Sequence, residues 1–139
     1  MLKKIIIMMT LLATLMLFAC IVSATDLNED TDQGGMRYKY IERVSVGLSI
    51  KDGTAKVTTE ARDVDGDTTS ISCTATLQKK SGDSWKKVRN WSKSTQSNVL
   101  SLSKAKAVSK GKYRVKSVVN AYKGNNHETV TKYSSTVSY

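Results

Sequence analysis

Three aspartates on alternate residues form the candidate metal site of the sequence. They lie in the run Asp63-Val64-Asp65-Gly66-Asp67. Calcium-binding loops use this spacing to bring several hard oxygen ligands around one ion. The match is partial, because Gly66 is fourth in the run where the standard loop has glycine sixth, and Thr74 takes the twelfth position in place of glutamate. Two interpretations stay open, a weak calcium site or a solvated acidic turn.

Basic side chains are the candidate binding residues, and they are concentrated toward the C-terminus. Residues 25–78 hold six Lys or Arg and ten Asp or Glu, whereas residues 79–139 hold 14 and two. A field of this sign attracts polyanions. We expect one patch on or near a shared sheet, made of Lys80, Lys86, Lys87, Arg89, Arg114, Lys116 and Lys132. The alternative is a solvated basic face that only keeps the protein soluble.

Nucleophilic chemistry has little support in the sequence. Cys73 shares the alternating parity of Ile71, Ala75 and Leu77, which predicts a buried thiol, and the one histidine, His127, lies in a turn-like stretch. The chain has no nucleophile elbow, no histidine pair with metal spacing and no glycine-rich phosphate loop. We therefore predict a protein that is not an enzyme and that holds no cofactor unless the aspartates bind calcium.

Strands are the elements that must position these side chains. Apolar residues alternate with polar ones from Arg37 onward, and Gly, Asn, Asp and Ser mark the breaks. The pattern predicts seven strands, placed at 44–50, 55–61, 71–77, 85–91, near 100–102, 113–121, and from the turn at 123–126 to residue 139. Seven short strands with one apolar face each predict an all-β fold, a single immunoglobulin-like antiparallel β-sandwich over residues 37–139.

The alternation also predicts a core. Its expected members are Val44, Val46, Leu48, Ile50, Val57, Ile71, Cys73, Ala75, Leu77, Leu100, Leu102, Tyr113, Val115 and Val119. Many of these are small, so Trp85 and Trp91 are expected to supply volume. Both indoles share parity with Lys87 and Arg89 but not with Val88, a conflict that a bulge in that strand would resolve.

Tyr113 is the candidate structural tyrosine. It opens a strand directly after the Gly-containing loop Ser109-Lys110-Gly111-Lys112. This position is typical of the tyrosine corner of Greek-key sandwiches, in which the ring is buried and the hydroxyl bonds to backbone upstream. The simpler alternative is that Tyr113 is only a good strand former.

The first 24 residues have the pattern of a secretory signal. Lys3 and Lys4 precede an apolar run from Ile5 to Val22, and Val22-Ser23-Ala24 offers a cleavage site. The alternatives are an uncleaved anchor and lipidation at Cys20. Residues 25–36 are acidic and contain glycine, which predicts a flexible leader. Cleavage after Ala24 leaves 20 basic and 12 acidic residues, and Cys73 alone cannot form an internal disulfide.

Several short motifs together resemble a family of small secreted proteins of Gram-positive anaerobes, described as a domain of unknown function with an immunoglobulin-like or fibronectin-III-like sandwich. The motifs are Leu77-Gln78-Lys79, Gly82-Asp83-Ser84-Trp85, Trp91-Ser92, Leu102-Ser103-Lys104 and Gly111-Lys112-Tyr113-Arg114-Val115. The resemblance covers residues 37–139. It implies export and an all-β fold, and it implies no activity, cofactor or catalytic residues.

These observations predict a secreted, monomeric binding module that acts at or outside the cell envelope. Its basic face would bind an anionic cell-wall polymer or glycan, since teichoic acids and anionic lipid headgroups are the abundant polyanions outside a Gram-positive cell. We expect no nucleic-acid partner, because the chain has no recognisable nucleic-acid motif, and no membrane span after cleavage. The competing hypothesis is a basic antimicrobial or membrane-active effector, against which the lack of a basic amphipathic helix argues.

Overall fold

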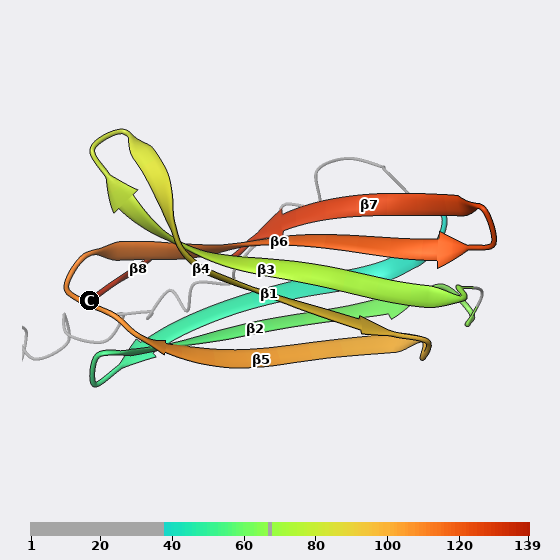
Figure 1. Cartoon of the computed structure of the whole chain (residues 1–139), viewed down its shortest axis with the longest axis horizontal. Coiled ribbons are helices and arrows are strands. Elements are labelled where there is room, and N and C mark those ends of the chain that lie inside the picture. Colours follow the sequence, from blue (N-terminus) through green and yellow to red (C-terminus); the bar gives the residue numbers. More distant parts are fainter. Residues whose placement is uncertain (1–37, 67) are drawn as a thin grey trace, which may run out of the picture. The chain divides into compact units, whose positions relative to one another are not determined.

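Antiparallel strands make up most of residues 38–66 and 68–139, the part of the chain that the computed structural model describes (Figure 1). The strands are β1 Ile41–Lys51, β2 Thr54–Asp63, β3 Ser70–Ser81, β4 Ser84–Thr95, β5 Val99–Ala107, β6 Lys112–Lys123, β7 Asn126–Tyr133 and β8 Val137–Ser138. The expected signal segment 1–24, the leader 25–36 and Asp67 lie outside the described residues. None of the described residues forms a helix long and apolar enough to cross a bilayer.

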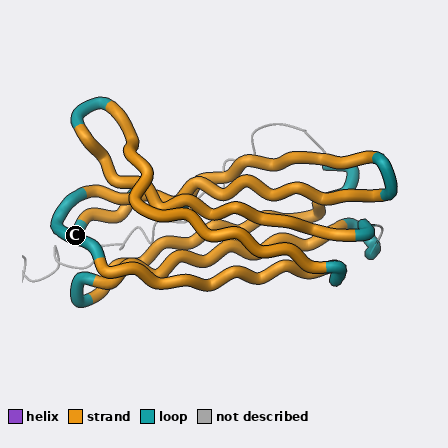
Figure 2. Tube along the Cα trace, viewed as in Figure 1, coloured by secondary structure: helices purple, strands orange, loops and turns teal. Residues whose placement is uncertain are grey.

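Two sheets face each other, which confirms the all-β sandwich. One sheet has the order β1-β2-β5, and the other has the order β4-β3-β6-β7, with the short β8 also paired to β6. Figure 2 shows strands joined by turns in both layers. In the constant-type immunoglobulin sandwich the fourth strand joins the sheet of the first two. Here β4 pairs with β3 instead, so the β3–β4 hairpin belongs wholly to the larger sheet.

The inner faces of both sheets form the core, as strand parity predicts. All the expected core residues are buried except Val46, Leu48 and Ile50, which are partly buried. These three lie on β1, an edge strand with a partner on one side only. Ten further residues are buried that the expected core did not include: Tyr40, Ile41, Ala55, Thr59, Ala61, Asp63, Ser117, Ala121, Val130 and Ser134.

A polar group lies in the middle of this core. Thr59 of β2 and Ser117 of β6 are fully buried, and their hydroxyl oxygens are 2.7 Å apart, so one donates to the other between the two sheets. The Cys73 thiol is buried as expected, and it lies beside both hydroxyls. Burial raises the pKa of this thiol, while hydrogen bonds from Thr59 and Ser117 act in the opposite direction. The thiol is therefore protonated at neutral pH.

A bulge in β4 places the two tryptophans on opposite faces. Leu77 pairs with Arg89 and Gln78 pairs with Lys87, so Val88 has no partner across the strands. Trp91 therefore lies opposite Ala75 and packs against the core. Trp85 lies opposite Lys80 on the outer face. The bulge expected from the sequence is present, but the expectation that Trp85 fills the core is wrong.

The last predicted strand is interrupted. β7 ends at Tyr133, and β8 pairs with the start of β6 instead of with its middle. Buried Ser134 fills the break, because its amide donates to the Val115 carbonyl at 2.9 Å and its hydroxyl accepts from the Val115 amide at 2.8 Å. A serine side chain thus replaces one rung of backbone pairing, which alternation alone does not reveal.

The expected tyrosine corner is present at the start of β6. The Tyr113 ring is fully buried, and its hydroxyl donates to the Ser109 carbonyl at 2.8 Å. Gly111 closes the loop with a φ of 151°, a conformation that favours glycine, and a Cβ there would lie 2.5 Å from Cε of Lys79. The Lys79 side chain therefore packs directly over the loop that leads to Tyr113.

The Tyr113→Phe variant tests the corner. It keeps the ring and leaves the Ser109 carbonyl without its donor, so we expect the free energy of unfolding to fall by about 1 kcal/mol. Chemical denaturation measures the change. A midpoint equal to that of the unchanged protein would mean that the hydroxyl contributes nothing to stability.

Candidate functional site

The two ends of the compact unit Arg37–Tyr139 carry different turns. One end holds the β1–β2 turn, the β3–β4 turn, the β5–β6 connection and the C-terminus. Backbone bonds join these parts, from the Val108 amide to the Gly53 carbonyl at 2.8 Å and from the Gly111 amide to the Tyr139 carbonyl at 3.0 Å. The other end holds the β2–β3, β4–β5 and β6–β7 turns. There the Val64 amide donates to the Tyr40 carbonyl at 3.1 Å.

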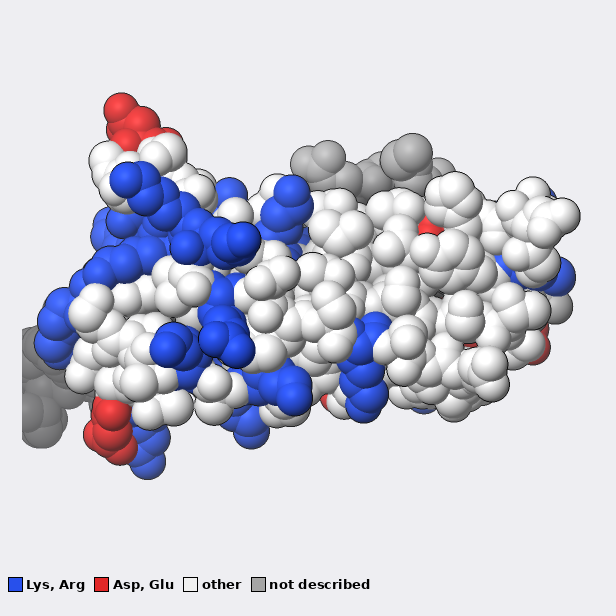
Figure 3. Space-filling view, viewed as in Figure 1, with Lys and Arg blue, Asp and Glu red and all other residues white. Residues whose placement is uncertain are grey.

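Charge is segregated between these ends. The half nearer the first end, which we call the basic end, holds Lys51, Lys56, Lys79, Lys80, Lys86, Lys87, Arg89, Lys104, Lys106, Lys110, Lys112, Arg114 and Lys116. Its described acids are Asp52 and Asp83. On the face drawn in Figure 3, lysine and arginine side chains gather on the side of the β3–β4 hairpin. The opposite half holds Glu42, Glu60, Asp63, Asp65 and Glu128 together with Lys39, Arg43, Arg62, Lys93 and Lys123, so its described charges nearly balance, and Lys132 lies near the middle.

The sequence division into residues 25–78 and 79–139 therefore does not match the division of charge in space. Lys51 and Lys56 belong to the segment that is acidic in sequence, yet the β1–β2 turn carries them to the basic end. With Lys104 they line a hollow of about 460 Å³ on the smaller sheet, beside the hydroxyls of Ser49, Thr54 and Ser103. Antiparallel topology is the cause, since each strand returns the chain to the end from which the previous strand left.

The seven residues expected to form one patch divide between two faces. Lys80, Lys87, Arg114 and Lys116 lie on the outer face of the larger sheet, because Gln78 pairs with both Lys87 and Arg114, and Thr76 pairs with Lys116. Lys86, Arg89 and Lys132 have the opposite parity, since their partners are Lys79, Leu77 and Ser117. The bulge at Val88 and the register of β7 separate these three from the outer face.

Arg114 is held in a stack that the sequence analysis did not foresee. Its Cζ is 4.3 Å from the Trp85 ring centroid and 4.5 Å from the Tyr133 ring centroid. Its Nε donates to Oε1 of Gln78 at 2.9 Å, and Nζ of Lys80 is 5.3 Å from the Trp85 ring. We call Lys80, Trp85, Arg114 and Tyr133 the Arg114 stack. The bulge in β4 is the sequence feature that could have revealed this stack, because it turns Trp85 to the outer face, toward β6.

Several other lysines of the basic end have structural contacts. Nζ of Lys79 donates to Oγ of Ser109 at 2.7 Å and lies 5.5 Å from the Tyr113 ring centroid, beside the tyrosine corner. Nζ of Lys110 lies 3.9 Å from the ring centroid of Tyr139. Lys86, Lys87, Arg89 and Lys116 make no hydrogen bond or ion pair with any residue that the structure describes. These four are therefore among the cations of the basic end that an external anion could reach without displacing a partner, as are Lys51, Lys56, Lys104, Lys106 and Lys112.

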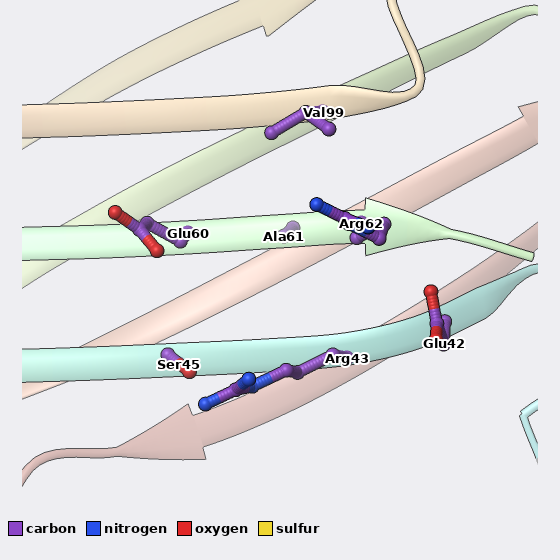
Figure 4. A pocket seen from close by; sticks show the side chains of 7 residues that line it. All are labelled: Glu42, Arg43, Ser45, Glu60, Ala61, Arg62 and Val99. Carbon is purple, nitrogen blue, oxygen red and sulfur yellow. The ribbon is translucent and has the colours of Figure 1, made fainter.

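A second hollow lies on the outer face of the smaller sheet, in the half away from the basic end. It measures about 290 Å³, and its lining includes Arg43, Arg62, Glu42 and Glu60 on neighbouring strands (Figure 4). Arg43 lies directly opposite Arg62, and Ser45 lies opposite Glu60. Two positive and two negative side chains balance here, so this hollow attracts anions less than the basic end does.

The aspartate run forms a tightly bonded turn. Oδ2 of buried Asp63 accepts from the Thr68 amide at 3.1 Å and from the Thr68 hydroxyl at 2.7 Å. Asp65 is exposed with a φ of 55°, and Asp67 lies outside the described residues. Residues 38–66 and 68–139 contain no group of three or more acidic, cysteine or histidine side chains arranged to hold a metal ion. Oδ2 of Asp63 is hydrogen-bonded within the turn. Because Asp67 lies outside the described residues, calcium binding stays a prediction.

Cys73 and His127 lie on opposite faces of the larger sheet. Cys73 points into the core opposite Val119, whereas His127 lies opposite Tyr122 on the outer face, with the two rings stacked at 5.8 Å. The His127 imidazole therefore does not reach the Cys73 thiol and cannot activate it as a nucleophile.

No protein-family model matches the chain, and a search of curated proteins finds no match. The family resemblance of the motifs remains a prediction.

Proposed function

We propose that the chain is an exported binding module that attaches through its basic end to an anionic polymer at or outside the cell envelope. The secretory pattern of residues 1–24 supports export. The single observation that carries the binding proposal is the gathering of lysine and arginine at one end of the sandwich, with acids mainly in the other half. Such a separation gives the domain a strong local field that its net charge alone would not give.

The mode of attachment follows from the cations that have no partner within the described structure. Lys87 and Lys116 lie on a solvent-facing sheet and bond to no described residue, so an arriving anion does not have to displace a partner. An anionic polymer would replace small counterions along this surface, and their release would drive binding. The Ser- and Thr-rich sheet face beside them would give the polymer uncharged hydrogen-bonding groups.

Two assays test the proposal. The purified protein is expected to sediment with isolated cell wall, to elute as salt rises, and to leave dye-loaded vesicles of anionic lipid intact. The fraction of protein that sediments with the wall should fall steeply as ionic strength rises, because each phosphate contact adds to the salt dependence of binding. Vesicle leakage without wall binding would reject the binding module in favour of the membrane-active effector.

A further inference from the structure

The outer face of the larger sheet has an unusual composition along its whole length. Strand register places on it Ser70, Ser72, Thr74, Thr76, Gln78, Lys80, Trp85, Lys87, Asn90, Ser92, Ser94, Lys112, Arg114, Lys116, Val118, Asn120, Tyr122, His127, Thr129, Thr131 and Tyr133. No aspartate or glutamate is among these described residues, and none of the side chains is buried. The face therefore combines hydroxyl and amide groups with cations and aromatic rings.

These groups are arranged in zones. The Arg114 stack, Lys87 and Lys116 occupy the basic end, and the stacked Tyr122 and His127 rings occupy the other end. Between them lie rows of Ser, Thr and Asn, some of which bond to each other, such as Thr74 with Ser92 at 2.9 Å. Neighbouring strands are roughly 4.8 Å apart, a spacing comparable to the length of one sugar unit. The face thus offers repeated hydroxyl partners to an extended polar chain.

Arg114 is the preorganised cation of this face. The rings of Trp85 and Tyr133 and the bond to Gln78 fix its guanidinium plane. A guanidinium that is already held loses little further freedom when it binds, and its fork matches the two oxygens of a carboxylate or phosphate. Only Nε bonds to a described residue, so the Nη donors have no partner within the described structure. Tyr133 keeps 45% of its surface exposed beside this fork.

The geometry points to an anionic polysaccharide as the ligand of this face. Arg114 would receive a carboxylate or phosphate group of the polymer, Tyr133 would stack on the adjoining sugar ring, and the Ser and Thr rows would bond the sugar hydroxyls. This inference rests on the proposed function and gives it a ligand class and a site. A polymer that only carries charge would use the lysines equally and would gain nothing from Tyr133 or the hydroxyl rows.

The test compares ligands with and without sugar. Binding is titrated by tryptophan fluorescence with polygalacturonate, with a phosphate-linked polysaccharide, with the sugar-free polymers polyglutamate and polyphosphate, and with neutral dextran. We expect at least one anionic polysaccharide to bind about tenfold or more tightly than the sugar-free polymer with the same anionic group. The polygalacturonate and phosphate arms identify which anion Arg114 receives.

Variants then locate the site. Arg114→Lys keeps the charge but removes the fork and the stacking, so affinity for the preferred polysaccharide is expected to fall about tenfold. Arg43→Lys, on the other sheet, is the matched control and should change affinity less than twofold. Tyr133→Ala removes an exposed ring and should lower the affinity for the polysaccharide to that for the sugar-free polymer. This variant tests the site on its own if Arg114→Lys does not fold.

The outcomes separate the two proposals. If no anionic polymer binds the unchanged protein, the proposed function fails. If sugar-free polymers bind as tightly as the polysaccharides, the anionic-polymer function stands and the polysaccharide inference is overturned. The inference is also overturned if folded Arg114→Lys and Tyr133→Ala proteins both bind the preferred polysaccharide within twofold of the unchanged protein.

Discussion

Reversing Lys86, Lys87 and Lys116 to glutamate is expected to weaken binding to an anionic wall polymer by at least about a hundredfold. Each cation near a negatively charged surface contributes about 1 kcal/mol, and the reversal adds repulsion to that loss. About 3 kcal/mol or more corresponds to at least a hundredfold change in the dissociation constant. The three side chains are not buried and bond to no described residue, so the free energy of unfolding should change little.

The matched control reverses Lys39, Arg43 and Arg62, three exposed residues in the half away from the basic end. It changes the net charge by the same amount and leaves the basic end intact. Lys51 and Lys56 would be unsuitable controls, because both line the basic hollow of the smaller sheet. Titration of both triple variants with the same polymer gives the comparison, and equal losses would mean that net charge alone drives attraction.

Replacing Glu128 with alanine is expected to lower the free energy of unfolding by about 2–3 kcal/mol. Its carboxylate accepts from the amides of Lys39, Tyr40 and Ile41 at 2.8, 2.9 and 3.0 Å, and so ties the start of β1 to β7 of the other sheet. Hydrogen bonds to a charged acceptor are among the stronger ones, and their loss leaves three donors unpaired. Chemical denaturation measures the loss, and hydrogen exchange should show faster exchange at these amides.

Glu42→Ala is the control for that measurement. Glu42 is an exposed acid in the same half of the domain, beside the segment that Glu128 holds. Its removal should change stability by less than about 0.5 kcal/mol. If the two variants lose the same small amount of stability, the contacts of Glu128 with the start of β1 contribute nothing to the fold.

Much of the fold could be predicted, because the alternation of apolar and polar residues along a strand can be recognised from neighbouring residues alone. The alternation of Ile71, Cys73, Ala75 and Leu77 already gives the inner face of β3. The features that were missed depend on partners distant in sequence. Ser134 replaces a backbone rung opposite Val115, and Glu128 bonds to amides 87 to 89 residues earlier in the chain. No local pattern specifies such pairings.

The candidate site was predicted less completely for the same reason. The basic character of the region is visible in composition, and parity places Arg114 and Lys116 outward as expected. Which cations share a face depends on the exact site of the β4 bulge and on the register of β7. A shift of one residue moves a side chain to the other face. The Arg114 stack exists because three strands bring Trp85, Arg114 and Tyr133 together.

The salt dependence of polymer binding tests the central claim most directly. The logarithm of the association constant is plotted against the logarithm of the salt concentration for the unchanged protein and both triple variants. Because the slope scales with the number of phosphate contacts, reversal of Lys86, Lys87 and Lys116 should make it shallower by roughly two to three. Reversal of Lys39, Arg43 and Arg62 should leave the slope unchanged. Equal slopes for the two variants would contradict a binding site at the basic end.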